Sequence, residues 1–158
     1  MEIKIRKAEK TDIPAILELI KELAEYERAP QEVTITEKQL LNDGFSNNPI
    51  FEVILAENSE DVLGMAFYFY SYSTWKGMCL YLEDIIVKNK YRGNGIGEIL
   101  FKEVIKKAKE KEAKRLQWQV LDWNEPAINF YKKKLNAVLD GEWINCKLTE
   151  QQIKEFKL

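Results

Sequence analysis

Glycines are concentrated where a predicted strand gives way to a predicted helix. Residues 92–97 read Arg-Gly-Asn-Gly-Ile-Gly, between an apolar run and an amphipathic one. The first backbone N–H groups of a helix have no partner within the helix, and glycines leave them open to a ligand. Such a bend is a candidate cradle for a phosphate group. A tight strand-to-helix turn also needs glycine, so the bend alone leaves that simpler alternative open.

The spacing of these glycines excludes two common phosphate-binding motifs. In a P-loop the last glycine is followed by lysine and then by serine or threonine, whereas Glu98 follows Gly97 here. The dinucleotide-binding fingerprint needs its third glycine one residue later, and it belongs to a first strand–helix unit. What remains is an Arg-x-x-Gly-x-Gly pattern after a strand.

Two carboxylates, Glu83 and Asp84, interrupt the apolar run before the bend. Side chains alternate along a strand, so we expect them on opposite faces of the sheet, with at least one on a covered side. An alkyl amine has a pKa of about 10.4, so a carboxylate can both attract its cation and accept its proton. Glu83 is therefore a candidate general base. For Asp84, a structural role beside backbone or lysine partners is an equal alternative.

A third candidate lies in residues 121–131, where a predicted strand leads into a short predicted helix. Tyr131 is a neutral hydrogen-bond donor at working pH, and a departing thiolate with a free pKa near 8.5 could take its proton. Plain aromatic packing of Phe130 and Tyr131 is the alternative.

The sequence contains no histidine. This removes the commonest general base, the usual activator of a catalytic serine or cysteine, and the commonest metal ligand. The two cysteines, Cys79 and Cys146, form neither a disulfide framework nor a metal pattern, and we expect both in the core. No metal site is predicted, and proton transfer is left to carboxylates, tyrosines, lysines, water or the backbone.

The composition is that of an ordinary globular protein, with 46% hydrophobic and 32% charged residues. A net charge of −2, with both signs interleaved, gives no support for nucleic-acid binding. No apolar run approaches the length that crosses a bilayer, and the first residues lack a signal-peptide core. The expected location is the cytoplasm.

The hydrophobic periodicity predicts a single domain over 1–158 with an α/β fold built on a mixed sheet. Three closely spaced strands leave no room for helical crossovers, so they should form an antiparallel meander. A later strand–helix–strand unit should add a parallel neighbour. The expected strands are near 3–5, 51–56, 62–72, 78–87, 115–121 and 142–148, and the expected helices are near 12–24, 36–44, 96–111 and 125–134.

Three segments, YLED, YRGNGIG and DWNEPAINFYK, resemble the diamine acetyltransferases of the GNAT superfamily. That group includes spermidine/spermine enzymes and thialysine enzymes, and residues 73–77 and 120–124 are more similar to the thialysine type. The polyamine type has an acidic residue where Ser73 stands. The resemblance therefore implies acetyl transfer to a small lysine-like amino acid or a diamine, with a weaker grip on a second, distant ammonium group.

The resemblance also implies the GNAT fold and acetyl-coenzyme A as the donor. The backbone of Ile85, Ile86 and Val87 would pair with the pantetheine arm. Further cofactor contacts would come from two loops, with Arg92, Gly93, Asn94, Gly95, Ile96 and Gly97 at the pyrophosphate and Asn124, Glu125, Pro126 and Ala127 near the thiol.

In the same comparison, Tyr131 would be the general acid to the thiolate, and Glu83 the base or proton relay. The amine pocket would be lined by Tyr26, Glu27, Trp75, Glu83 and Asp84. Relatives of this type are homodimers, and we expect the same here. Alternatives are a polyamine acetyltransferase, a protein acetyltransferase on the same fold, and a non-catalytic acyl-coenzyme A sensor.

Overall fold

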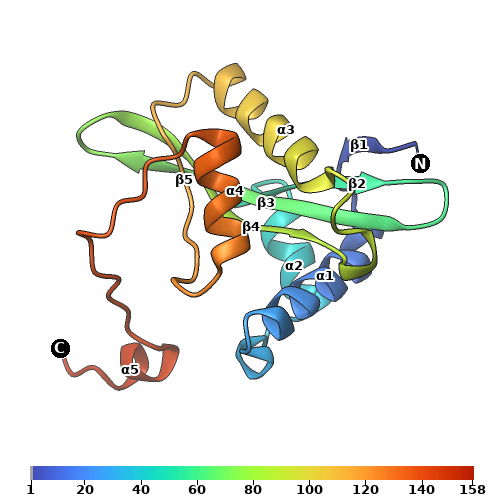
Figure 1. Cartoon of the computed structure of the whole chain (residues 1–158). Helices are drawn as coiled ribbons and strands as arrows, with labels where there is room; N and C mark the ends of the chain where they lie inside the picture. The colour runs from blue at the N-terminus through green and yellow to red at the C-terminus, as the bar shows by residue number, and fades with distance from the viewer. Residues whose placement is uncertain (1) are drawn as a thin grey trace. The chain divides into compact units, whose positions relative to one another are not determined.

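The computed structural model describes residues 2–158 and contains one five-stranded sheet (Figure 1). Strands β1 to β4 are antiparallel neighbours in chain order, and β5 pairs with β4 in parallel. The predicted meander and the parallel unit that follows it are therefore confirmed. The strands are β1 Lys4–Lys7, β2 Glu52–Glu57, β3 Val62–Ser73, β4 Gly77–Val87 and β5 Leu116–Gln117.

Helices cover both faces of the sheet, with α1 and α2 on one face and α3 on the other (Figure 1). Thr36 begins α2 with the predicted capping box, in which its Oγ1 accepts from the Gln39 N–H and the Gln39 Oε1 accepts from the Thr36 N–H. The α-helices are α1 Ile13–Tyr26, α2 Glu37–Gly44, α3 Ile96–Glu110, α4 Glu125–Leu135 and α5 Glu150–Glu155.

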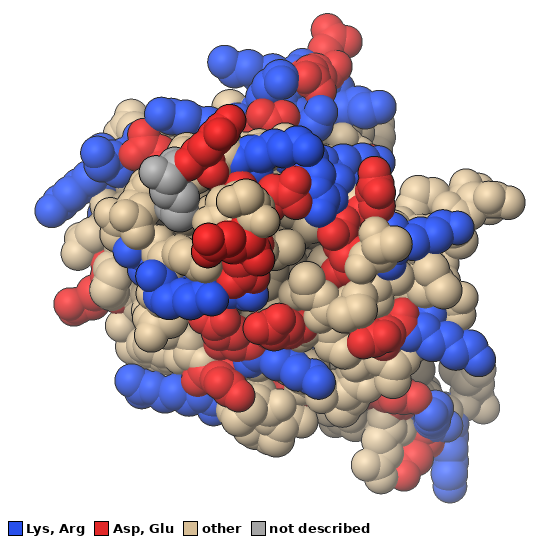
Figure 2. Space-filling model, turned by 90° about the vertical axis from the view of Figure 1, so that its right-hand side faces the viewer, with Lys and Arg blue, Asp and Glu red and all other residues tan. Residues whose placement is uncertain are grey.

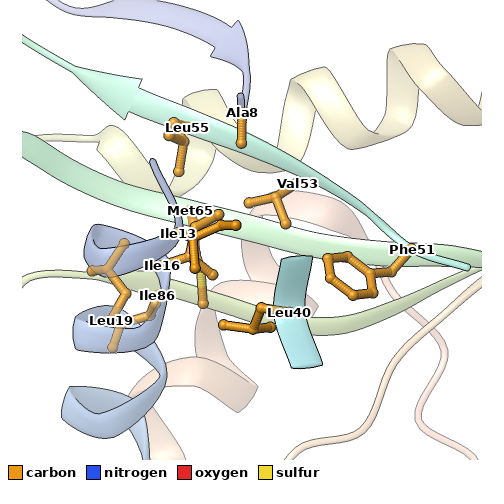
Figure 3. Packing of buried hydrophobic residues seen from close by; sticks show 10 residues of the cluster. All are labelled: Ala8, Ile13, Ile16, Leu19, Leu40, Phe51, Val53, Leu55, Met65 and Ile86. Atoms are coloured by element: carbon orange, nitrogen blue, oxygen red, sulfur yellow. The ribbon is translucent and has the colours of Figure 1, made fainter. Parts of the chain in front are cut away.

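A cluster of buried apolar side chains lies between α1, α2 and the sheet (Figure 3). The Phe51 and Phe67 rings stack with centroids 4.2 Å apart. Burying one such side chain contributes about 1.5–3 kcal/mol, so the cluster fixes α1, and with it Tyr26 and Glu27 at its end, against β3 and β4. The cluster consists of Ala8, Ile13, Ile16, Leu19, Leu40, Phe51, Val53, Leu55, Met65 and Ile86.

The α3 helix closes the opposite face with Ile96, Leu100, Phe101 and Val104. The Phe101 ring packs edge-on against Trp118, with centroids 4.9 Å apart. This packing anchors the N-terminal half of α3, so the glycine bend leads into a buried helical segment.

Residues 142–148, predicted as a last strand, form no strand. Trp143 and Ile144 are 72% and 87% exposed. Cys146, expected in the core, is also exposed, whereas Cys79 is buried. An alternating pattern forms a strand only beside an edge that satisfies its backbone groups, and within residues 2–158 no strand pairs with this segment.

The described residues group into two compact units, one ending at Gln119 and one from Val120 to Leu158. The first holds the sheet, and the second holds α4 and α5. Among residues 2–158 no helix is both long enough and apolar enough to span a membrane. On the face shown in Figure 2, acidic and basic side chains are interleaved, as the near-neutral composition predicts.

Candidate functional site

A β-bulge interrupts the pairing of β3 with β4 at the predicted carboxylates. Tyr68 lies opposite Leu82, but Phe67 lies opposite Asp84, so Glu83 is an extra residue in β4. Cross-strand partners share a face, which places Asp84 with Phe67 on the α1 side. Leu82 pairs with Tyr68 and points to the opposite side of the sheet. Glu83 follows Leu82, so by alternation it points to the same side as Asp84. The expectation of opposite faces is therefore wrong, because the bulge breaks the alternation.

The bulge gathers negative charge beside the end of α1. Burial, together with the smaller contributions of the Glu83 and Glu27 charges, raises the pKa of the Asp84 carboxyl to about 7. Burial also raises the pKa of Glu27. For Tyr81, burial raises the hydroxyl pKa first, and the Glu83 and Asp84 charges add to it. A cation entering this cluster would relieve the repulsion, and a carboxyl with a pKa near neutrality can exchange a proton there.

The strand edge next to the bulge is open. β5 pairs with β4 only at Leu80 and Tyr81. Farther along, the Lys88 N–H donates to the Leu63 carbonyl at 2.8 Å. Because an antiparallel ladder alternates, Ile86 bonds toward β3, whereas Ile85 and Val87 direct their backbone groups to the other edge. Of the three residues predicted to pair with pantetheine, Ile85 directs both its N–H and its carbonyl to this edge, and Val87 directs its N–H there while its carbonyl accepts from Arg92.

The glycine bend follows this edge. Gly93 and Gly95 have φ values of 79° and 75°, a left-handed conformation that favours glycine. Within residues 2–158, the N–H groups of Gly93 to Gly97 donate to no acceptor. The Arg92 Nε donates to the Val87 carbonyl at 3.0 Å, and its Cζ lies 4.6 Å from the centroid of the Tyr26 ring. The bend therefore has five consecutive N–H groups without an internal acceptor, and it follows an arginine that is fixed by two contacts.

Gly97 distinguishes between the two explanations of the glycine bend, a phosphate-binding site and a tight strand-to-helix turn. Its φ is not positive, and a Cβ added there would meet only the Val87 Cγ2 at an ordinary 3.8 Å. Neither backbone conformation nor internal packing requires glycine here, although glycine in a helix costs about 0.5–1 kcal/mol relative to alanine. A ligand that approaches the backbone closely would account for it. This favours a binding bend over a mere turn.

In the second unit, Asn124 is the N-cap of α4, and its Oδ1 accepts from the Ala127 N–H at 3.4 Å. Pro126 occupies the first turn, as suits a helix start. Tyr131 is only 7% exposed, and its ring lies edge-on to Phe130 with centroids 5.7 Å apart. The capping role of Asn124 was missed from the sequence.

Trp75 stands apart from the carboxylates. It lies in the β3–β4 turn and is 82% exposed, and the Ser73 Oγ accepts from its N–H at 3.3 Å. From Gly77 to Asp84 the strand rises about 3.3 Å per residue, which separates the turn from the bulge by roughly 20 Å. Within one chain the structure does not bring Trp75 to the predicted amine pocket.

A family model for the acetyltransferase (GNAT) family matches residues 13–137. The chain therefore belongs to this family, and the predicted class of enzyme and its fold are confirmed.

Among relatives, the thialysine N-epsilon-acetyltransferase of Bos taurus is 44% identical over 138 residues, covering 82% of this chain and 81% of that protein. The spermidine/spermine N(1)-acetyltransferase-like protein 1 of Homo sapiens is 37% identical over 146 residues, covering 88% of this chain and 21% of that protein. An integron cassette protein of V. cholerae superimposes with a TM-score of 0.80 at 26% identity, covering 98% and 97% of the two chains.

Proposed function

We propose that this protein transfers the acetyl group of acetyl-coenzyme A to the primary amine of a small lysine-like amino acid such as thialysine. The observation that carries the proposal is the carboxylate cluster at the β4 bulge, where Asp84 has Glu83 and Glu27 as neighbours. Such a cluster suits an ammonium group. The relatives named as thialysine enzymes, at 41–44% identity over most of their length, point to the same acceptor.

The residues present fit an acyl-coenzyme A. The open edge offers the Ile85 backbone groups and the Val87 N–H to an amide-containing arm, and the unpaired N–H groups of the bend, with Arg92, suit a diphosphate. Acetyl-coenzyme A would supply the activated acetyl thioester. Residues proposed to hold it are Ile85, Ile86, Val87, Arg92, Gly93, Asn94, Gly95, Ile96, Gly97, Asn124, Glu125, Pro126, Ala127 and Tyr131.

The chain's own groups divide the proton transfers between them. Asp84 and Glu27 would hold the ammonium, and the exposed Glu83 would accept the proton that the amine loses, directly or through water. As the nitrogen–carbon bond forms and the carbon–sulfur bond breaks, Tyr131 would donate a proton to the departing sulfur. With no histidine to activate a nucleophile, direct attack is favoured over a covalent acyl-enzyme.

We also propose a cytoplasmic homodimer. Trp75 and its neighbour Tyr72 are large, apolar and exposed at the tip of a hairpin, as expected of residues that meet a partner. A second copy could thus contribute Trp75 to a pocket that one chain leaves without it. Light scattering after size exclusion tests this proposal, and a monomer at micromolar concentration would refute it.

The experiment for the acceptor is a thiol-release assay with acetyl-coenzyme A and a panel of thialysine, lysine, ornithine, putrescine, spermidine and spermine. We expect the highest kcat/KM for thialysine. A preference for spermidine or spermine would instead establish the polyamine type. Coenzyme A binding without release for any amine would favour a sensor, and peptides outcompeting the small amines would indicate protein acetylation.

A further inference from the structure

Asp61 contacts three residues that directly precede the glycine bend. Its Oδ1 accepts from the Lys88 Nζ at 2.8 Å, and its Oδ2 lies 2.8 Å from the Lys90 Nζ. The Tyr91 hydroxyl donates to the same Oδ2 at 3.3 Å. Asp61 belongs to the turn between β2 and β3, 27 residues before Lys88 in the chain. One carboxylate therefore ties a distant turn to residues 88–91, which we call the approach segment.

The two ion pairs differ in strength. The Lys88 side chain is only 9% exposed, whereas that of Lys90 is 63% exposed. An ion pair in water contributes little, but a buried ammonium that loses its counter-ion is left with a large desolvation cost. The Glu18 carboxylate is the other anion beside Lys88, at 3.5 Å, and it is mostly exposed. Lys88 therefore depends chiefly on Asp61.

The turn that carries Asp61 is itself fixed. The Asn58 Oδ1 accepts from the Glu60 and Asp61 N–H groups at 2.9 and 2.8 Å, and the Asn58 N–H donates to the Asp61 carbonyl at 3.0 Å. A side chain bonding to its own turn in this way restricts the backbone there. The Asp61 side chain therefore extends from a turn whose backbone conformation is restricted.

A second support reaches the approach segment from the other side. The Asn89 N–H donates to the Glu22 Oε1 of α1 at 2.7 Å. In the bend that follows, the N–H groups of Gly93 to Gly97 donate to no acceptor within residues 2–158, while the Asn94 Nδ2 donates to the Tyr91 and Arg92 carbonyls at 3.0 and 3.3 Å. The approach segment is therefore the place where side chains of other elements fix the chain before the bend.

We propose that Asp61 is a positioning residue for the diphosphate seat, acting through Lys88, Lys90 and Tyr91 to hold the bend in its binding geometry. The inference rests on the proposed function, because it takes the bend to be that seat. A preformed set of donors binds an anion more tightly than a set that must be ordered on binding. Asp61 lies outside every pattern that the sequence motifs mark.

Electrostatics alone predicts that neutralising Asp61 would strengthen coenzyme A binding, whereas the positioning role predicts that it would weaken it. The direction of the change in affinity therefore tests the proposal. Asp61 is an anion near an anion site, so replacing it with a neutral residue leaves Lys88 and Lys90 uncompensated. If electrostatics dominated, coenzyme A would then bind more tightly, and most clearly at low salt. If positioning dominates, coenzyme A binds more weakly at all salt concentrations.

The test compares Asp61→Asn with Glu60→Gln in the full chain. Both changes replace a carboxylate with an amide of the same shape and so remove one negative charge, and within residues 2–158 the Glu60 side chain forms no hydrogen bond or ion pair. Calorimetry measures binding of coenzyme A and of pantetheine, which lacks the diphosphate. We expect Asp61→Asn to weaken coenzyme A binding about tenfold and to leave pantetheine binding within about twofold, with Glu60→Gln like the parent protein.

A second measurement needs no ligand. Hydrogen exchange of the approach segment and bend in the ligand-free protein should accelerate in Asp61→Asn and not in Glu60→Gln. If Asp61→Asn fails to fold, Tyr91→Phe removes one of the three contacts without changing any charge and leaves buried Lys88 paired. That variant should weaken coenzyme A binding severalfold.

The outcomes separate the two proposals. Equal loss for coenzyme A and pantetheine, an unchanged affinity, or tighter binding in Asp61→Asn would each overturn the positioning role. If the parent protein bound coenzyme A no better than pantetheine, the diphosphate seat itself would be refuted, and this inference with it. Asp61→Glu, which restores the charge, should recover part of the lost affinity.

Discussion

Two aspartates, one in the β2–β3 turn and one in the β4 bulge, have opposite environments. Asp61 accepts hydrogen bonds from Lys88 and Lys90, which lower the pKa of its carboxyl to about 2. Asp84, in the β4 bulge, has no such cation among residues 2–158: burial, with smaller contributions from the charges of Glu83 and Glu27, raises its pKa to about 7. The Asp61 carboxylate is neutralised by cations of the protein itself, whereas the Asp84 carboxylate can take a cation from a ligand.

The difference in environment indicates different roles for the two aspartates, a structural role for Asp61 and a role in ligand binding for Asp84. A buried carboxylate without a counter-ion costs folding free energy, and such costs persist at functional sites. A carboxylate with two ammonium partners gains stability and has no capacity for a further cation. In this protein the first kind lies at the proposed amine pocket, and the second lies behind the proposed diphosphate seat.

The largest effect should come from the exposed carboxylate of the bulge. Glu83→Gln keeps the shape of the side chain but cannot accept the proton of the amine, so kcat/KM should fall about 10²- to 10⁴-fold. Coenzyme A affinity, measured by calorimetry, should stay within about twofold because the bend is untouched. Glu60→Gln is the matched control. Unchanged turnover would show that Glu83 is not the base.

Asp84→Asn should act mainly on the amine. Replacing one carboxylate of the cluster should raise KM for the amine about tenfold, with a smaller change in kcat. In the parent protein, amine affinity should rise with pH through about 7, as the Asp84 carboxyl loses its proton. Steady-state kinetics between pH 6 and 8 should show this step in the parent protein and not in the variant. A step that persisted in Asp84→Asn would belong to another group.

The two aspartates should also give opposite pH dependences of stability. The folded pKa of Asp84 is raised, so its ionisation lowers the free energy of unfolding as pH rises from about 4 to about 7. Asp84→Asn should therefore become relatively more stable across that window, by on the order of 1–2 kcal/mol.

The folded pKa of Asp61 is lowered, so its contribution is present above about pH 4 and is lost as pH falls toward about 2. Asp61→Asn should lack that acid-dependent loss. Urea unfolding at a series of pH values measures both slopes. Slopes of the same sign for the two aspartates would contradict the assignment of their environments.

Much of the site could be predicted from local sequence. The glycine bend, Glu83 and the start of α4 lie within short segments whose residue types and spacing carry their own chemical meaning, whereas Glu27 was proposed only from the resemblance to a family. The meander followed from strand spacing, and the capping box of α2 from Thr36 and Gln39.

The remainder depends on contacts that no local pattern encodes. The bulge shifts register at one pair, and the alternating sequence of β4 gives no sign of it. The Asp61–Lys88 contact joins residues 27 apart, and Lys88 looks like any lysine at a strand end. The predicted strand at 142–148 failed for the same reason, because pairing needs an edge that periodicity cannot supply.

The smallest effect should come from Gly97→Ala, which is informative because stability and coenzyme A affinity should change in opposite directions. Gly97→Ala removes the entropic cost of glycine at a position that tolerates a Cβ, so the ligand-free protein should become more stable by about 0.5–1 kcal/mol. The added methyl would nevertheless narrow the approach to the unpaired N–H groups, so coenzyme A should bind severalfold more weakly. Gly64→Ala is the opposite control, because its Cβ would lie 2.4 Å from the Ile86 carbonyl and should destabilise the fold. If Gly97→Ala gained stability and kept full coenzyme A affinity, the bend would be a turn rather than a seat, and Asp61 would support structure alone.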